Sequence, residues 1–142
     1  RAARERLVES ENRFRLAAGA AQGLVYELDF RTGLVWRSDG LERLLGYRPD
    51  EVPPTAAWWT ERVDVEDRER LAGGLGRIRE GESLFESEYR IQHRNGQWLH
   101  VLERTYIERD AEGGLRRAVG HTIDITERKL HEAALALSEE RF

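Results

Sequence analysis

The ten residues Gly120-His121-Thr122-Ile123-Asp124-Ile125-Thr126-Glu127-Arg128-Lys129 decide the fold, because a strand pattern gives way there to a helix pattern. Before Asp124, apolar and polar residues alternate as in a half-buried strand. On one side of this predicted strand lie residues of the same parity, namely Leu115, Val119, His121, Ile123 and Ile125. After it, Leu130, Ala134 and Leu137 recur at helical spacing, which predicts a helix. Asp124 or Thr126 can cap this helix.

Two more strands precede this stretch. The first has Phe85, Tyr89 and Ile91 on one face and charged residues on the other. Asn95-Gly96 is a strong hairpin signal, so we expect a second, antiparallel strand over residues 97–108. The inward face of that strand stays open between two sets: Trp98, Leu102 and Tyr106, or Leu99, Val101 and Ile107.

The first half of the chain combines helices with two further strands. Residues 24–30 alternate, and Gly33 suits a turn into a strand over residues 34–37. The side chains expected on the inward face are Leu24, Tyr26, Leu28 and Phe30. Helices are predicted for residues 1–18, for a short stretch that ends at Gly46, and for residues 64–80, where three glycines predict a weak or bent helix. Runs of strands separated by helices predict an α+β domain with one antiparallel sheet.

Composition narrows the function classes. The 142 residues suffice for one domain with a real core, and the net charge of -4 comes without the basic stripe that nucleic-acid binding needs. No apolar run approaches the roughly 18 residues of a membrane span, so we expect no membrane contact in this segment. The chain has no Cys, which excludes disulfides, thiolate metal sites and cysteine nucleophiles.

Five residues near each end of the chain are almost the same. Residues 10–14 read SENRF and residues 138–142 read SEERF, each in a helix-favouring context with a Leu three residues before the Ser. We therefore expect a second copy of the domain to begin near residue 138. A chain that begins with Arg1 and has no Met is also expected to be an internal fragment.

Several motifs, taken together, resemble those of the PAS domain subgroup whose helical connector carries tryptophans. They are Leu44-Leu45-Gly46-Tyr47 with Glu51, Trp58-Trp59 ahead of Asp67-Arg68, Tyr89-Arg90-Ile91 ahead of Asn95-Gly96 and Trp98, and residues 120–129. The resemblance covers roughly residues 10–130. The family often has His-Pro-Asp-Asp-Arg where this chain has residues 64–68, so a ligand role for that histidine does not carry over.

The resemblance implies a five-stranded antiparallel sheet with helices on one face, closing over a pocket. We expect an N-terminal linker helix over residues 1–18, a PAS sensory domain over residues 19–126, and a C-terminal signalling helix over residues 127–142 that leads into a next PAS domain. The implied role is a non-enzymatic, cytoplasmic input domain of a histidine kinase or cyclic-dinucleotide enzyme. Two alternatives stay open: a structural dimerisation or spacer module without ligand, and a flavin or heme redox sensor.

The candidate pocket combines strand parity with the resemblance. Its residues are Tyr26, Trp36, Leu45, Trp58, Leu75, Ile78, Tyr89, Ile91 and His121. We expect Trp36 and Trp98 in the core, and only one of Trp58 and Trp59 inside. The absence of Cys excludes a covalent flavin adduct, and residues 64–80 have no His for heme, so no cofactor is the favoured expectation. His121 is the one reasonable candidate for an axial heme ligand, because it shares strand parity with Val119 and Ile123. A histidine hydrogen-bonded within the sheet is the simpler interpretation. No group of His, Asp or Glu residues has the spacing of a metal site.

Two further features predict how the module works. The Asp124-Ile125-Thr126 junction, between the last strand and the exit helix, is the expected signal relay, because a bistable cap would couple a sheet movement to the helix. The terminal helices carry short apolar seams, Leu7 with Phe14 and Leu130 with Leu137. We therefore expect a homodimer through these helices, with adjacent PAS and effector domains as partners within the parent chain and a small molecule as a candidate ligand.

Overall fold

The computed structural model describes residues 22–140, and in it five strands form one antiparallel sheet in the order β2-β1-β5-β4-β3. The strands are β1 (Leu24–Asp29), β2 (Val35–Arg37), β3 (Leu84–Gln92), β4 (Trp98–Arg109) and β5 (Leu115–Asp124). β1 and β5 therefore pair in the middle of the sheet, although they lie at opposite ends of the described sequence of strands. The expected α+β fold with a five-stranded antiparallel sheet is confirmed.

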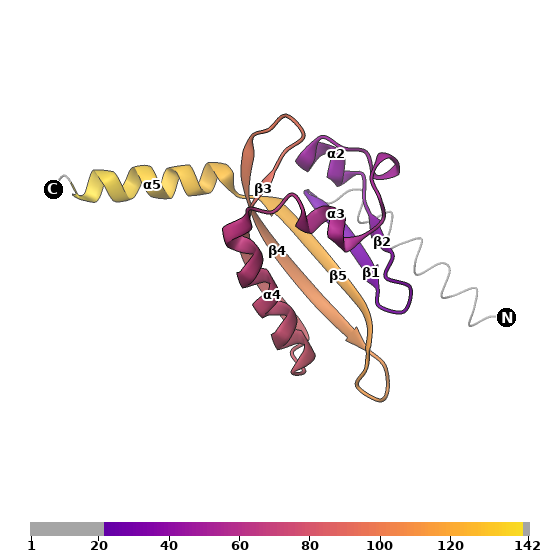
Figure 1. Cartoon of the computed structure of the whole chain (residues 1–142). Coiled ribbons are helices and arrows are strands. Elements are labelled where there is room, and N and C mark those ends of the chain that lie inside the picture. Colours follow the sequence, from indigo (N-terminus) through magenta and orange to yellow (C-terminus); the bar gives the residue numbers. More distant parts are fainter. Residues whose placement is uncertain (1–21, 141–142) are drawn as a thin grey trace.

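The helices between β2 and β3 all cover one face of this sheet (Figure 1). They are α2 (Gly40–Leu45), the 3-10 helix η1 (Pro49–Glu51), α3 (Ala56–Thr60) and α4 (Val65–Arg79). The last helix, α5 (Thr126–Glu140), leaves the end of β5 and projects away from the domain (Figure 1). The helix predicted for residues 1–18, with Leu7 and Phe14, lies outside the described residues.

Glycines set two of the helix features. Gly46 ends α2 in the left-handed conformation, with φ of 85°, as the sequence predicts. The helix predicted for residues 64–80 forms as one continuous α4 in spite of its three glycines. Gly74 has a packing reason, because a Cβ there would come within 2.1 Å of the Phe85 ring on β3. The close approach of the helix to the sheet outweighs the lower helix propensity of glycine.

The core has two parts on the helix-covered face. The larger cluster joins α2 and α3 to the sheet, and its members include Leu24, Leu41, Leu45, Trp58, Val63, Tyr89, Ile91 and Val101. The smaller cluster, under α4, consists of Phe85, Ile107 and Ala118. On β4 the inward set is therefore the one with Val101 and Ile107, whereas Trp98 and Tyr106 are 49% and 60% exposed. The expectation that Trp98 is core is wrong.

The inward face of β5 is the opposite of the predicted one. Ala118, Gly120 and Thr122 are buried, whereas His121 is exposed and shares its face with Val119 and Ile123. The register explains this, because Gly120 pairs with Tyr26 on β1 and with Thr105 on β4, and both of these side chains point to the helix-covered face. Trp36 on β2 also lies on the outer face, half-buried, because Val35 and Arg37 occupy the inner one.

Candidate functional site

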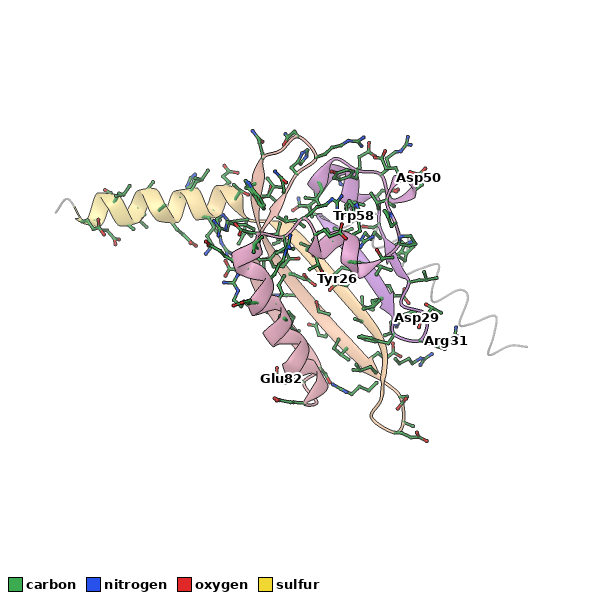
Figure 2. All side chains as sticks on the ribbon, viewed as in Figure 1. Tyr26, Asp29, Arg31, Asp50, Trp58 and Glu82 are labelled. Carbon is green, nitrogen blue, oxygen red and sulfur yellow. The ribbon has the colours of Figure 1, made fainter. Side chains whose placement is uncertain are left out.

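A cavity of about 190 Å³ lies between the sheet and the helices, bordered by both core clusters. Its apolar wall comes mainly from the sheet and consists of Leu24, Leu28, Phe30, Val35, Phe85, Ile107 and Ala118. Trp59 and Leu71 close it from α3 and α4. The polar side chains in the wall are Tyr26, Arg37, Thr60, Glu103 and Thr105. Figure 2 shows Tyr26 on the helix-covered face, near α3.

Glu103 on β4 is the centre of a hydrogen-bond network in this wall. Its Oε2 accepts from the Tyr26 hydroxyl and, at 2.9 Å, from Thr105 Oγ1. Its Oε1 accepts from Tyr89 Oη at 2.5 Å, and Trp59 Nε1 donates to that same Tyr89 oxygen at 2.8 Å. Tyr26 Oη and Thr105 Oγ1 also lie 2.7 Å apart. The network therefore connects β1, β3, β4 and α3 through one carboxyl group.

Both tyrosines keep their protons. Burial, and then the adjacent Glu103 carboxylate, raise the pKa of Tyr26 well above its ordinary value of 10.0. The same two causes raise the pKa of Tyr89. Each phenol therefore stays a hydrogen-bond donor at neutral pH, and the orientation of the Glu103 carboxyl group is fixed by hydroxyl donors.

Arg37 supplies a positive charge in the same cavity wall. Its guanidinium donates to the carbonyl oxygens of Pro53, at 3.1 Å, and Thr55, at 2.7 Å, and lies 5.2 Å from the centre of the Trp58 ring. Burial, and then the nearby Arg62, lower the pKa of Arg37 to about 10, so the group is still cationic at neutral pH. These hydrogen bonds tie β2 to the segment that leads into α3.

The structure assembles only part of the predicted pocket. Tyr26 lines the cavity, and Tyr89 reaches it through Glu103. Trp36 and His121 lie on the outer face, where the His121 ring contacts the backbone oxygen of Gln22, so neither can contact a ligand in this cavity. Three predicted residues pack in the larger core cluster rather than in the cavity wall: Leu45, Trp58 and Ile91. Leu75 and Ile78 belong to α4, but their side chains lie outside what the structure describes.

Sequence reasoning missed the polar residues of the wall. Glu103 and Thr105 share parity with Val101 and Ile107, so choosing that face of β4 would have found them. Arg37 lies two positions after Val35, so the alternation of β2 would have predicted that both side chains face inward. Trp58 is inside, as expected for one member of the pair, but Trp59 also faces inward and closes the cavity.

The residues present do not fit heme or flavin. The cavity is smaller than the roughly 300–1,000 Å³ of sites for drug-sized ligands, and both cofactors exceed that ligand size. None of the described wall residues is a His or a Cys, so heme would lack an axial ligand of the usual kind among them. Among the described residues no group of three or more His, Asp or Glu side chains is placed to hold a metal ion.

The junction between β5 and α5 is held by hydrogen bonds to β4. The Asp124 carboxylate accepts from the Thr126 amide at 2.9 Å and from its hydroxyl at 2.6 Å. The amide of His100 on β4 donates to Thr126 Oγ1 at 2.9 Å, and the amide of Ile125 donates to the His100 carbonyl at 2.8 Å. The first turn of α5 is also tied to β3, because Lys129 Nζ lies 2.9 Å from Glu88 Oε1. The helix thus starts from a fixed point on the sheet.

The PAS fold family matches residues 34–122 of the chain. The chain belongs to the PAS fold family. Its relatives include the sensor protein FixL of Bradyrhizobium diazoefficiens, which is 31% identical over 116 residues, covering 80% of this chain and 22% of that protein. Another is the two-component sensor PprA of Pseudomonas aeruginosa, 36% identical over 83 residues, or 58% of this chain and 9% of that protein.

Solved structures agree with this assignment to the PAS family. The sensory box histidine kinase/response regulator of Burkholderia thailandensis superposes with a TM-score of 0.74 and 29% identity, over 91% of this chain and 96% of that one. These relatives confirm the expectation of a sensory input domain from a signalling protein. This PAS chain spans less than a quarter of FixL and of PprA. None of its described helices is long and apolar enough to cross a membrane.

Proposed function

We propose that this PAS domain senses a small molecule in the cavity beneath α3 and α4 and passes the bound state to α5. The observation that supports the proposal is that β4 contributes both to the cavity network and to the start of α5. Glu103, the centre of the cavity network, lies on the same strand as His100, which fixes the start of α5 through Thr126. A ligand that displaces the Glu103 carboxyl group would therefore act on the strand from which the exit helix starts.

The parent protein is proposed to be a multidomain, cytoplasmic signalling protein in which this domain has no catalytic role. Its relatives are sensors, one of them a histidine kinase with a response regulator, which supports a histidine kinase as the effector. A cyclic-dinucleotide enzyme stays the second prediction. The relay at residues 124–126, and the boundaries of the sensory unit at residues 19–126, belong to the same proposal.

A second role, dimerisation, is favoured by the surface of α5. Leu130, Leu135 and Leu137 are each at least 60% exposed, and none of the helix residues is buried. Leu130 and Leu137 lie one heptad apart, so they form a seam that a second copy of the helix would cover. Dimerisation is compatible with sensing, because a paired exit helix can transmit a rotation or shift.

The decisive experiment is a thermal-shift screen of small molecules against the wild type and Ala118→Leu. Ala118 belongs to the cavity wall and has no part in the Glu103 network, so a leucine there fills the cavity. A true ligand at about 100 times its Kd stabilises the folded domain by about 2.7 kcal/mol, and the variant should lose that shift. If no compound stabilises the wild type, or if each one stabilises both proteins equally, the spacer module without ligand is correct.

A further inference from the structure

Glu103 is a carboxyl group in an apolar cavity wall with no cationic partner among the described residues. Its contacts there are the hydroxyl groups of Tyr26, Tyr89 and Thr105, and no described Lys, Arg or His forms an ion pair with it. Carboxylates inside proteins are normally paired, because burying a lone charge is costly. The cavity wall therefore has one carboxyl group with which no described cation forms a direct ion pair.

The protein donors around Glu103 are already committed. Tyr89 Oη accepts from Trp59 and gives its one proton to Oε1 of Glu103. The hydroxyls of Tyr26 and Thr105 are occupied with Oε2 and with each other. A carboxylate has about four acceptor positions, so Oε1, with a single described donor, still has one free. A ligand that approaches this oxygen has to bring the donor itself.

We propose that the cavity selects a small, largely apolar ligand with a cationic or N–H donor head, such as a primary amine or an amidine. This inference rests on the proposed sensing function and names the ligand class of that site. The head would pair with Glu103, and the body would lie against the apolar wall of Leu28, Phe85 and Ile107. Because a 150 Å³ cavity can bind benzene, about 190 Å³ admits a benzene-sized body with a short head group.

Anionic ligands are disfavoured by the same geometry. The only described cation in the wall is Arg37, and its guanidinium already donates to two backbone carbonyls and lies over Trp58. An anion in so small a cavity would meet the like charge of Glu103. The cavity is therefore expected to distinguish cationic from anionic ligands through Glu103. This preference can be measured separately from whether a ligand binds at all.

The test titrates the wild-type chain with benzylamine, benzyl alcohol and benzoate at pH 7 and follows binding by calorimetry or NMR. The three probes share an aromatic body and differ in the charge of the head. The ammonium group of benzylamine adds a charge–charge attraction to Glu103 that the hydroxyl of benzyl alcohol lacks, so benzylamine should bind about tenfold more tightly, or about 1.4 kcal/mol, and benzoate, which has the like charge, most weakly. Equal affinities for the three probes, or preference for benzoate, would overturn the proposed ligand class while ligand binding in the cavity stands.

Variants assign the preference to Glu103. Glu103→Gln keeps the shape and removes the charge, so it should bring benzylamine and benzyl alcohol to similar affinity. Glu108→Gln, on the same strand but paired with Arg117 on the outer face, should leave the preference unchanged. An unchanged preference in Glu103→Gln contradicts the assignment. If no probe binds the wild type, the proposed ligand class fails, whereas the thermal-shift screen with Ala118→Leu decides the proposed function; the wild-type titrations give this result even if a variant does not fold.

Discussion

Gly120 controls where Tyr26 can lie. The two residues are register partners on neighbouring strands, and a Cβ at position 120 would come within 2.1 Å of Tyr26 Cζ. The missing side chain gives the aromatic ring its place, and the ring in turn brings its hydroxyl to Glu103 and Thr105. One glycine on β5 therefore positions a polar group in the cavity wall.

Gly120→Ala should destabilise the domain by about 1–3 kcal/mol, the usual cost of overpacking, because the Tyr26 ring has to move and lose its hydrogen bonds. Urea unfolding followed by circular dichroism measures this. Gly73→Ala is the matched control, because no atom lies within 4 Å of its added methyl group. That variant should gain up to about 1 kcal/mol from helix propensity. Equal effects of the two substitutions would mean that the close approach of Tyr26 to Gly120 is unimportant.

At the scale of elements, the junction before α5 depends on short polar side chains. Asp124→Ala removes two hydrogen bonds to Thr126 and should cost about 1 kcal/mol of stability. It should also increase amide hydrogen exchange in the first turn of α5 and reduce the signal response of the parent protein. Asp110→Ala is the control, because Asp110 also accepts two hydrogen bonds, here from the backbone amides of Glu112 and Gly114, but in the hairpin between β4 and β5. A normal response in Asp124→Ala would contradict the relay.

The ion pair between α5 and β3 should make the helix attachment sensitive to acid. The hydrogen bond from Lys129 is the largest cause that lowers the pKa of Glu88 below its ordinary value of 4.5. Because the folded-state pKa is lowered, the stabilisation is complete above that ordinary value and is lost as pH falls through the folded value. Both side chains are more than a third exposed, so the effect is small.

The measurement compares the melting midpoints of the wild type and Glu88→Gln from pH 7 down to pH 3. The wild type should melt at the higher temperature at pH 7, and the difference should disappear at the acid end. Glu86→Gln is the control. Glu86 lies on β3, as Glu88 does, but its ion pair is with Arg104 of β4 and does not involve α5. A difference that stays constant with pH would rule out the pair with Lys129 as its source.

The sheet also shows what periodicity can and cannot predict. Alternation in β1 and β3 identified their inward faces, because most large apolar residues of each strand lie on one side, with Val25 and Leu84 as the exceptions. β5 has Val119 and Ile123 on one face and Ala118 and Gly120 on the other, and the larger set misled the prediction. Packing is the physical reason, because Gly120 leaves room for the Tyr26 ring and Ala118 borders the cavity. A hydrophobic pattern does not predict positions at which a small inward-facing residue is required.

At the scale of the whole molecule, α5 presents an apolar seam without a partner among the described residues. Leu130→Glu should shift a dimer toward monomers, because it places a charge in the centre of the seam. Sedimentation equilibrium at several concentrations measures the shift. Leu135→Glu changes an equally exposed leucine that lies on another side of the helix, so it should leave the association constant unchanged. Equal loss of association in both variants would contradict the assigned seam.

The fold was predictable as a whole, but the cavity was not. The order of elements follows from turns such as Asn95-Gly96 and from the strand-to-helix change at residue 124, which are local signals. The Glu103 network joins residues that lie as far apart as positions 26 and 105, and no local pattern connects them. Tyr26 and Tyr89 were found only because they share parity with apolar neighbours, whereas Glu103 looks like an ordinary solvent-facing residue.

The placement of Ala118 has an evolutionary consequence. This side chain borders the cavity but takes no part in the Glu103 network or in the attachment of α5, so a larger residue there would reduce the cavity without removing a hydrogen bond from either. Mutations at this site would alter which molecules are accepted while the output machinery is inherited intact. Paralogues of such a domain can therefore diverge in the signal they report before they diverge in anything else.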